Sequence, residues 1–218
     1  MRTDGLIRAL VAEARPVRRL PSPERRAFTW LLLSAAYGAF IVFMIGLRPD
    51  IQTKLTDVPF ALETGAAFLT GLSAAVAAFC AGVPGRPLWE RSVPLAPLAV
   101  WLASLGEGCW RSWVRLGAAG LDMQPDLICF PSILLVSVVP GALILWMIRR
   151  GAPITPVAAT ALATLAAAAL GAAALRLFHT QDASVMVLVW QFGSVAVLTG
   201  LGALGGRQLL RWPERQAA

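Results

Sequence analysis

The chain has 218 residues, of which 57% are hydrophobic and only 14% are charged, and its mean hydropathy is +0.68. A composition this apolar excludes an ordinary soluble domain and is typical of a protein that crosses a membrane several times. The net charge of +7 does not indicate nucleic-acid binding, because the arginines are dispersed near the ends of the apolar segments.

The N-terminal segment, residues 1–27, is the one long polar stretch, and it predicts a short amphipathic helix followed by a basic, extended linker. Leu6, Ile7, Leu10 and Val11 recur at spacings of three and four, which places them on one helical face. We call these four residues the arm face. Pro16 ends the helix. A helix this short is not stable alone in water, so its apolar face needs a partner protein, the bilayer interface or the protein's own spans.

Six apolar segments follow, and they predict an all-α bundle of six transmembrane helices over residues 28–206, before a tail at 207–218. Five of the six have 20 or more residues, enough to cross a hydrocarbon core of about 30 Å at about 1.5 Å per residue. The third is shorter, has two prolines near its start and could extend toward Cys109. The predicted spans are roughly 28–47, 60–82, 93–106, 127–148, 156–177 and 184–206.

The distribution of basic residues predicts the orientation of these spans. With six spans both termini lie on one side, and that side holds fourteen of the 19 basic residues. This bias places both termini in the cytoplasm. The longest connection, 107–126, then lies outside, where Trp110 and Trp113 indicate either a short helix in the membrane interface or an irregular loop.

Glu63 is the one acidic residue predicted inside a span. It lies about one turn from the outer end of the second span. An ionisable residue there is a functional hypothesis by default. Its position near the outer end favours a structural role instead, such as pairing with an arginine. No other charge is expected deep in a span, which argues against a proton relay or ion-coupled transport.

Cys109, Cys129 and His179 all map to the outer side and are the candidate sensing residues. Two thiols in an oxidising compartment could form a disulfide, and the two thiols with the histidine could bind a metal. The simplest interpretation leaves His179 in a solvated loop. Cys80 maps to the inner end, as a packing residue. Neither a cofactor nor an enzyme is expected, because no nucleophile–base pair, HExxH motif, phosphate loop or paired carboxylate site is present.

Several short stretches, in order along nearly the whole chain, carry a resemblance to a known family. They are TDGLIRALVAEARPVRRL, GLRPDI, VPGRP, ICFPSI, RRGAPITP, LRLFHTQDASVMVLVW and GRQLLRW. Together they resemble the NrsF-type family of six-span membrane anti-sigma factors of bacteria. Each motif is modest by itself, and their joint order gives the resemblance its specificity.

The resemblance implies an inner-membrane protein whose cytoplasmic N-terminal segment holds an extracytoplasmic-function sigma factor inactive. It implies that the arm face belongs to the sigma-binding helix, and that outward-facing cysteines, here Cys129, take part in sensing oxidative or metal stress. The family usually has His-Cys where this chain has His179 and Thr180, so the second sensing thiol is missing from its usual place. Cys109 is the candidate substitute.

Two other functions stay open on the sequence alone: a small transporter or channel, and an assembly subunit of a larger membrane complex. A transporter needs polar residues along a pore, and only Glu63, Ser73 and a few other serines and threonines qualify. Deletion of residues 1–20 separates these functions, because a transporter should keep its activity and an anti-sigma factor should lose it.

Overall fold

The computed structural model describes residues 3–13, 20–126, 128–151 and 155–210. All regular structure in these ranges is helical, which confirms the predicted all-α class. In chain order the elements are α1 (Thr3–Glu13), α2 (Pro23–Ile45), α3 (Ile51–Leu55), α4 (Val58–Ala81), η1 (Leu88–Arg91), α5 (Leu95–Leu116), η2 (Gly117–Leu121), α6 (Cys129–Arg149), α7 (Pro156–Leu175), α8 (Ser184–Met186), η3 (Val187–Phe192) and α9 (Gly193–Leu209).

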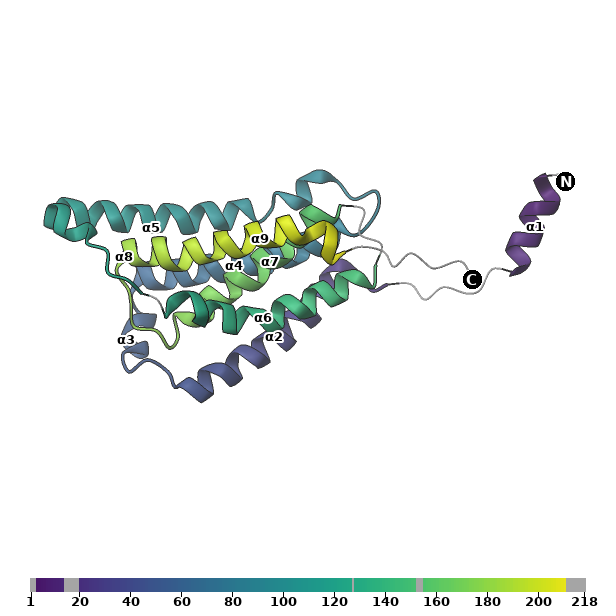
Figure 1. Ribbon diagram of the computed structural model, residues 1–218. Coiled ribbons are helices and arrows are strands. Elements are labelled where there is room, and N and C mark those ends of the chain that lie inside the picture. The colour runs from purple at the N-terminus through teal and green to yellow at the C-terminus, as the bar shows by residue number, and fades with distance from the viewer. Residues whose placement is uncertain (1–2, 14–19, 127, 152–154, 211–218) are drawn as a thin grey trace.

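The long helices run along one common direction, so the bundle has two ends (Figure 1). The terminal end holds the start of α2 and the last residues of α6 and α9. The distal end holds α3, η2 and the connection 176–183 between α7 and α8. Helix α2 packs on the bundle near the terminal end and diverges from it toward the distal end (Figure 1).

Helix α7 is the centre of the bundle and packs against α4, α6 and α9. It is rich in alanine, and neighbouring helices meet it through glycines. A Cβ added to Gly71 of α4 would lie 3.0 Å from the Ala166 carbonyl oxygen, and one added to Gly206 of α9 would lie 2.9 Å from Val157 Cα. Small residues at these positions allow the backbones to approach closely, which is the usual basis of helix packing in membranes.

Two clusters of buried apolar side chains fill the bundle. One lies toward the terminal end and includes Trp30 and Phe79. The other lies toward the distal end and includes Trp101 and Leu105, with Phe192 packed edge-on against Trp101 at 5.4 Å between ring centroids. Edge-to-face aromatic pairs of this kind stabilise a core beyond their area of contact.

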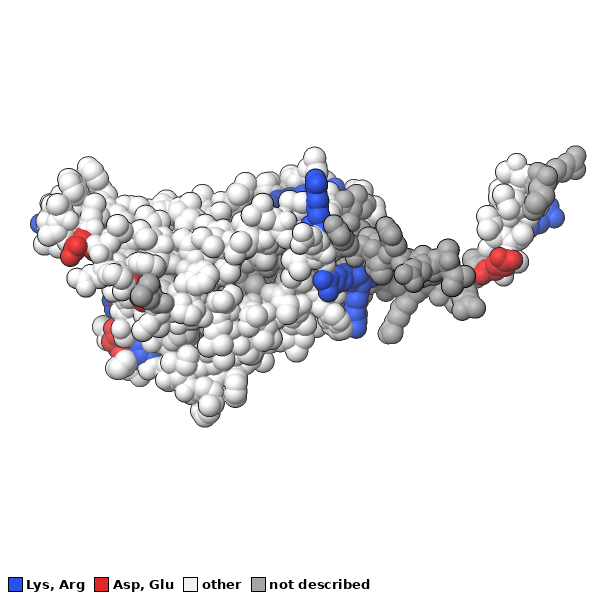
Figure 2. Space-filling view, viewed as in Figure 1, with Lys and Arg blue, Asp and Glu red and all other residues white. Residues whose placement is uncertain are grey.

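Among the described residues, five helices are long and apolar enough to cross a membrane. They are α2, α4, α6, α7 and the continuous helix Ser184–Leu209, which is made of α8, the π-helical η3 and α9. Figure 2 agrees with this, because on the face in view lysine, arginine, aspartate and glutamate gather near the two ends of the bundle and its length between them is almost free of these residues. The protein is therefore a multi-pass membrane protein. The sixth predicted span, α5, is 22 residues long but is not among these five helices, and its second half carries Glu107, Arg111 and Arg115.

Helix α5 corrects two expectations for the middle of the chain. It continues to Leu116, so a third span that stops at 106 is too short, and the predicted separate helix over 107–126 is in fact the end of α5 followed by η2. Nothing in residues 106–116 breaks the helix, and Glu107 pairs with Arg111 one turn later at 2.7 Å. The helix ends at Gly117, whose φ of 60° favours glycine.

The start of α2 also differs from the prediction, which placed an extended linker before residue 28. The helix begins at Pro23, because Ser22 accepts a hydrogen bond from the Arg25 amide at 3.4 Å and a proline at the first helical position needs no amide partner. The predicted helix end at Pro16 and most of the tail 207–218 lie outside the described residues.

Candidate functional site

The arm face lies on α1, which is helical from Thr3 to Glu13 as the sequence predicts. All eleven residues of this helix are exposed, and Figure 1 shows it away from the bundle. The four apolar side chains of the arm face have exposed fractions between 46% and 69%. A helix of this length depends on burial of an apolar face for its stability. Within the described residues, the arm face is therefore an apolar surface that stays exposed.

Helix α2, which follows the N-terminal segment, is fixed to the bundle at its base. Trp30 donates its indole N–H to the Pro140 carbonyl of α6 at 2.9 Å. The Arg26 guanidinium donates to the Met147 carbonyl and lies 4.4 Å from the centre of the Phe79 ring. These contacts anchor the first turns of α2, so the segment that carries the arm face leaves the bundle from a rigid base.

The distal end holds a group of charged residues, which we call the distal cluster: Arg48, Asp50, Lys54, Glu63, Arg176 and Asp182. Glu63 pairs with Arg176 at 3.0 Å, and their side chains are only 7% and 4% exposed. This confirms the prediction that Glu63 pairs with an arginine. The pair joins α4 to the end of α7 inside the bundle, where an unpaired charge would be costly.

Arg48 connects the distal end of α2 to the rest of the cluster. Its guanidinium binds both carboxylate oxygens of Asp182 at 2.9 and 2.7 Å, and it also binds Asp50. Lys54 of α3 reaches the same Asp182 at 2.9 Å. Bidentate arginine–carboxylate pairs are among the stronger and more directional ionic contacts. The distal cluster therefore fastens α2 and α3 to the loop before α8.

The electrostatics of Asp182 show that this fastening persists over a wide pH range. Partial burial alone would raise its pKa, but hydrogen bonds from Arg48 and Lys54 outweigh burial and lower the pKa to about 2. The hydrogen bonds that Arg48 donates to the Asp182 and Asp50 carboxylates likewise raise the pKa of its guanidinium. Asp182 and Arg48 therefore both stay charged near neutral pH.

Of the candidate sensing residues, His179 contacts the distal cluster, because its backbone carbonyl accepts a hydrogen bond from Arg48 at 3.2 Å. Cys129 is the first residue of α6 and is 1% exposed, and its amide donates to the Asp126 carbonyl at 3.3 Å. His179 is not a freely solvated loop residue, because its Nε2 lies 2.7 Å from Asp126 Oδ2. Asp126 thus joins the histidine to the first turn of α6, a link that the sequence alone did not indicate.

Neither the possible disulfide nor the possible metal site is found among the described residues. Cys80, Cys109 and Cys129 are all free, so the possible bond between Cys109 and Cys129 is absent here. Across residues 3–13, 20–126, 128–151 and 155–210, no group of three or more His, Cys, Asp or Glu side chains is placed to hold a metal ion. Cys109 is half-buried and lies on α5, whereas Asp126 and His179 lie on other segments of the chain.

A family model described as NrsF, negative regulator of sigma F, matches residues 10–212, which is nearly the whole chain. The chain belongs to the NrsF family. The match begins within the arm face, at Leu10, and ends beyond α9. The resemblance inferred from the sequence motifs is thereby confirmed, and the protein is an anti-sigma factor family member rather than an enzyme.

A curated relative in the NrsF family is the anti-sigma-F factor NrsF of Caulobacter vibrioides (strain NA1000 / CB15N). It is 29% identical to this chain over 221 residues, and the alignment covers 97% of this chain and 100% of the relative. No solved structure matches the chain. The relative is therefore similar along its full length, arm and bundle together.

Proposed function

We propose that this chain is a membrane-anchored anti-sigma factor whose N-terminal segment binds and inactivates an extracytoplasmic-function sigma factor. The observation that carries the proposal is the exposed arm face, on a chain that belongs to a family of negative regulators of sigma F. The name of the Caulobacter relative supports a sigma factor as the partner.

The arm face accounts for inhibition by occlusion. Burial of a large apolar side chain contributes roughly 1.5–3 kcal/mol, so four such side chains on one helix can supply most of a useful affinity. The apolar surfaces of a sigma factor that bind RNA polymerase are the natural counterpart. Anchoring to the membrane keeps the bound sigma factor away from DNA, but occlusion carries the inhibition, because tethering acts only on partners already nearby.

Orientation and span number complete the proposal. Six spans, with α5 as the third, place both termini on one side, and the excess of basic residues there puts them in the cytoplasm of a bacterial inner membrane. A reporter active only in the cytoplasm should be active when fused after Ala218 and inactive when fused within 117–128. The opposite pattern would remove the arm face from the compartment of the sigma factor.

The distal end is then the side on which a stress signal is received. Cys129 begins α6 beside Asp126, which pairs with His179 at the end of α7. Oxidation or soft-metal capture of the thiol would disturb the packing between these two helices, and both helices extend to the terminal end from which α2 and the arm begin. We propose this route for release of the sigma factor.

The experiment that tests the function measures sigma-dependent transcription in cells that carry the full chain or a variant lacking residues 1–20. The proposal predicts full derepression in the deletion variant at unchanged membrane levels of the protein. Continued repression would show that the arm face is not the inhibitor. A transporter or an assembly subunit would leave transcription unchanged in the deletion variant.

A further inference from the structure

A large apolar groove of about 970 Å³ lies between α2 and the helices α4, α6 and α7. It opens where α2 diverges from the bundle toward the distal end (Figure 1). Its α2 wall includes Ser34, Gly38 and Val42, and its opposite wall includes Phe60 and Gly65 of α4. The groove lies on helices that span the membrane, so its surroundings are lipid.

The glycines of the groove show that protein atoms do not fill it. A Cβ added to Gly38 or to Gly65 would meet no atom within 4 Å, although both residues line the groove on facing walls. A Cβ added to Gly71, one and a half turns further along α4, would instead lie 3.0 Å from the α7 backbone. Protein interiors normally leave few voids larger than a water molecule. The groove therefore has room for another molecule.

The depth of the groove fits one leaflet of a bilayer. Its wall on α2 runs from Ser34 to Gly46, which corresponds to about 18 Å at about 1.5 Å per residue, little more than half of a hydrocarbon core of about 30 Å. Toward the terminal end α2 closes on α6 through the Trp30–Pro140 hydrogen bond. A transmembrane helix crosses both leaflets, whereas a lipid tail ends near the midplane.

The walls of the groove suit acyl chains, because almost all of the residues that line it are apolar. The hydroxyl oxygens of the two polar lining residues, Ser34 and Thr64, are shielded from solvent. Leu47 and Leu55 line the mouth, and the chain between them carries Asp50 and Lys54.

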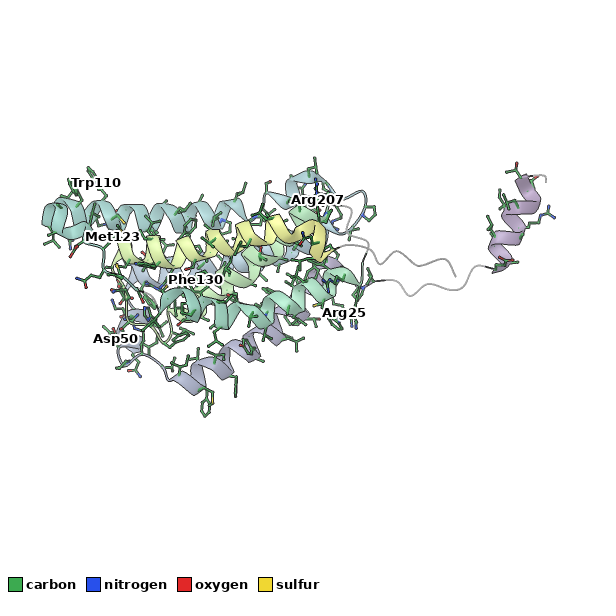
Figure 3. The ribbon with its side chains drawn as sticks, viewed as in Figure 1. Arg25, Asp50, Trp110, Met123, Phe130 and Arg207 are labelled. Atoms are coloured by element: carbon green, nitrogen blue, oxygen red, sulfur yellow. The ribbon has the colours of Figure 1, made fainter. Side chains whose placement is uncertain are left out.

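The mouth of the groove presents mainly negative charge to solvent. The side chains of Asp50 and Asp57 are 46% and 44% exposed, while that of Lys54 is 26% exposed and that of Arg48 only 1%. Arg48 is already bound to Asp50 and Asp182. The Asp50 carboxylate is bound to Arg48 and that of Asp57 lies 3.9 Å from Lys54, but both keep exposed surface that would attract the amine of a zwitterionic headgroup. Figure 3 shows Asp50 at this end of the bundle.

We propose that the groove is a binding site for one phospholipid, with its acyl chains between α2 and α4 and an ethanolamine headgroup at the Asp50–Asp57 rim. The bound lipid contacts the outer half of α2, the same helix whose base follows the N-terminal segment.

The test uses the full chain, purified from bacterial membranes in mild detergent and examined by native mass spectrometry for retained phospholipid. Gly38→Leu and Gly65→Leu place a large side chain in the groove from two different helices. Gly200→Leu is the matched control, because a Cβ at Gly200 also meets open space but on the exposed side of α9, outside the groove. Leucine favours helix over glycine, so all three variants should fold, as circular dichroism will show.

The expected result is one retained phospholipid on the unaltered chain and on Gly200→Leu, and at least about a tenfold smaller lipid-bound fraction in Gly38→Leu and Gly65→Leu. Equal retention in all four proteins would show annular lipid only and overturn the proposal. A lipid-free dimer that becomes monomeric in Gly38→Leu would assign the groove to a second copy of the chain. Retention of an isoprenoid lipid in place of phospholipid would also overturn it.

The headgroup is tested by lipid exchange in nanodiscs of phosphatidylethanolamine or phosphatidylglycerol. The unaltered chain should retain phosphatidylethanolamine in preference, and Asp57→Asn should weaken this preference several-fold without loss of helical content. A preference for phosphatidylglycerol would contradict the assignment of the amine to the acidic rim.

Discussion

The arm face and the distal cluster both depart from the usual rule that apolar side chains are buried and charged side chains are exposed. The arm face exposes four large apolar side chains, and the distal cluster buries Glu63 and Arg176. The buried charges have partners within the chain, whereas the exposed apolar residues of α1 have none in the part of the chain that the structure describes. The distal cluster therefore holds parts of the bundle together, whereas the proposed function assigns the arm face to another molecule.

The largest expected effect comes from breaking the most buried ion pair. Arg176→Met removes the partner of Glu63 and leaves a carboxylate in a site that is 7% exposed. The loss of one partner of a buried pair costs about 3–5 kcal/mol. We expect the free energy of unfolding in detergent, followed by circular dichroism, to fall by this amount.

The double variant Glu63→Gln/Arg176→Met sharpens this prediction. It removes both charges, so it should recover most of the loss. If Arg176→Met alone proves as stable as the unaltered chain, the ion pair does not hold α4 and α7 together, and the structural role assigned to the distal cluster is wrong.

A smaller effect is expected at Asp182, which accepts hydrogen bonds from Arg48 and is paired with Lys54. Asp182→Asn should lower the free energy of unfolding by roughly 1.5–3 kcal/mol, the usual contribution of hydrogen bonds to charged groups. Binding of the sigma factor by the arm face should be unchanged in this variant, because Asp182 belongs neither to the arm face nor to the proposed route through Cys129, Asp126 and His179.

The same residue predicts a dependence of stability on pH. The pKa of Asp182 is lowered from an ordinary value of 3.8 to about 2, so its contribution is complete above pH 3.8 and is lost as the pH falls toward 2. Unfolding temperatures measured between pH 7 and pH 2 should show this acid loss in the unaltered chain. Asp182→Asn should reduce it. An identical acid profile in both proteins would contradict the assignment.

The smallest effect on stability, but a specific effect on signalling, is expected at Cys129. Cys129→Ser should lower the free energy of unfolding by about 1–3 kcal/mol, which is the cost of a buried hydroxyl without a hydrogen-bond partner. Cells carrying it should lose their transcriptional response to oxidant or cadmium at unchanged protein levels. Cys80→Ser is the matched control, because Cys80 is equally buried but lies at the terminal end.

A normal response in Cys129→Ser, and again in Cys109→Ser/Cys129→Ser, would remove the thiols from the mechanism. The proposed function would then depend on the arm face alone.

Much of the fold follows from the sequence because local patterns determine it. The apolar runs predict α4, α6, α7 and the Ser184–Leu209 helix to within a few residues, and the spacing of the arm face predicts α1. The length of α5 was missed because its second half is amphipathic, and hydropathy alone ends the span where polar residues begin. The first turn of α2 was missed because two prolines and several charges resemble a linker.

The distal cluster shows what sequence reasoning could not provide. Glu63 is recognisable as an intramembrane acid, and an arginine partner is a natural expectation. The pairing of Arg48 with Asp182 joins residues 134 positions apart, so it depends on how α2 and the loop before α8 are placed by packing. The Asp126–His179 contact is of the same kind, across 53 positions. The one available signal for these contacts was that the sequence places residues of opposite charge at the outer ends of the predicted spans.

The most direct test of the central claim compares two substitutions on α1 in the full, membrane-embedded chain. Leu10→Asp places a carboxylate in the arm face, and Ala12→Asp places the same group on the opposite side of the same helix, at a residue that is also exposed. Co-purification of the sigma factor with each variant is the measurement. The account predicts at least about a hundredfold weaker binding for Leu10→Asp, since burial of one leucine contributes roughly 2 kcal/mol and an unpaired charge adds to the loss. Ala12→Asp should bind nearly as well as the unaltered chain. Equal binding by both variants, or equal loss in both, would contradict the claim that the arm face holds the sigma factor.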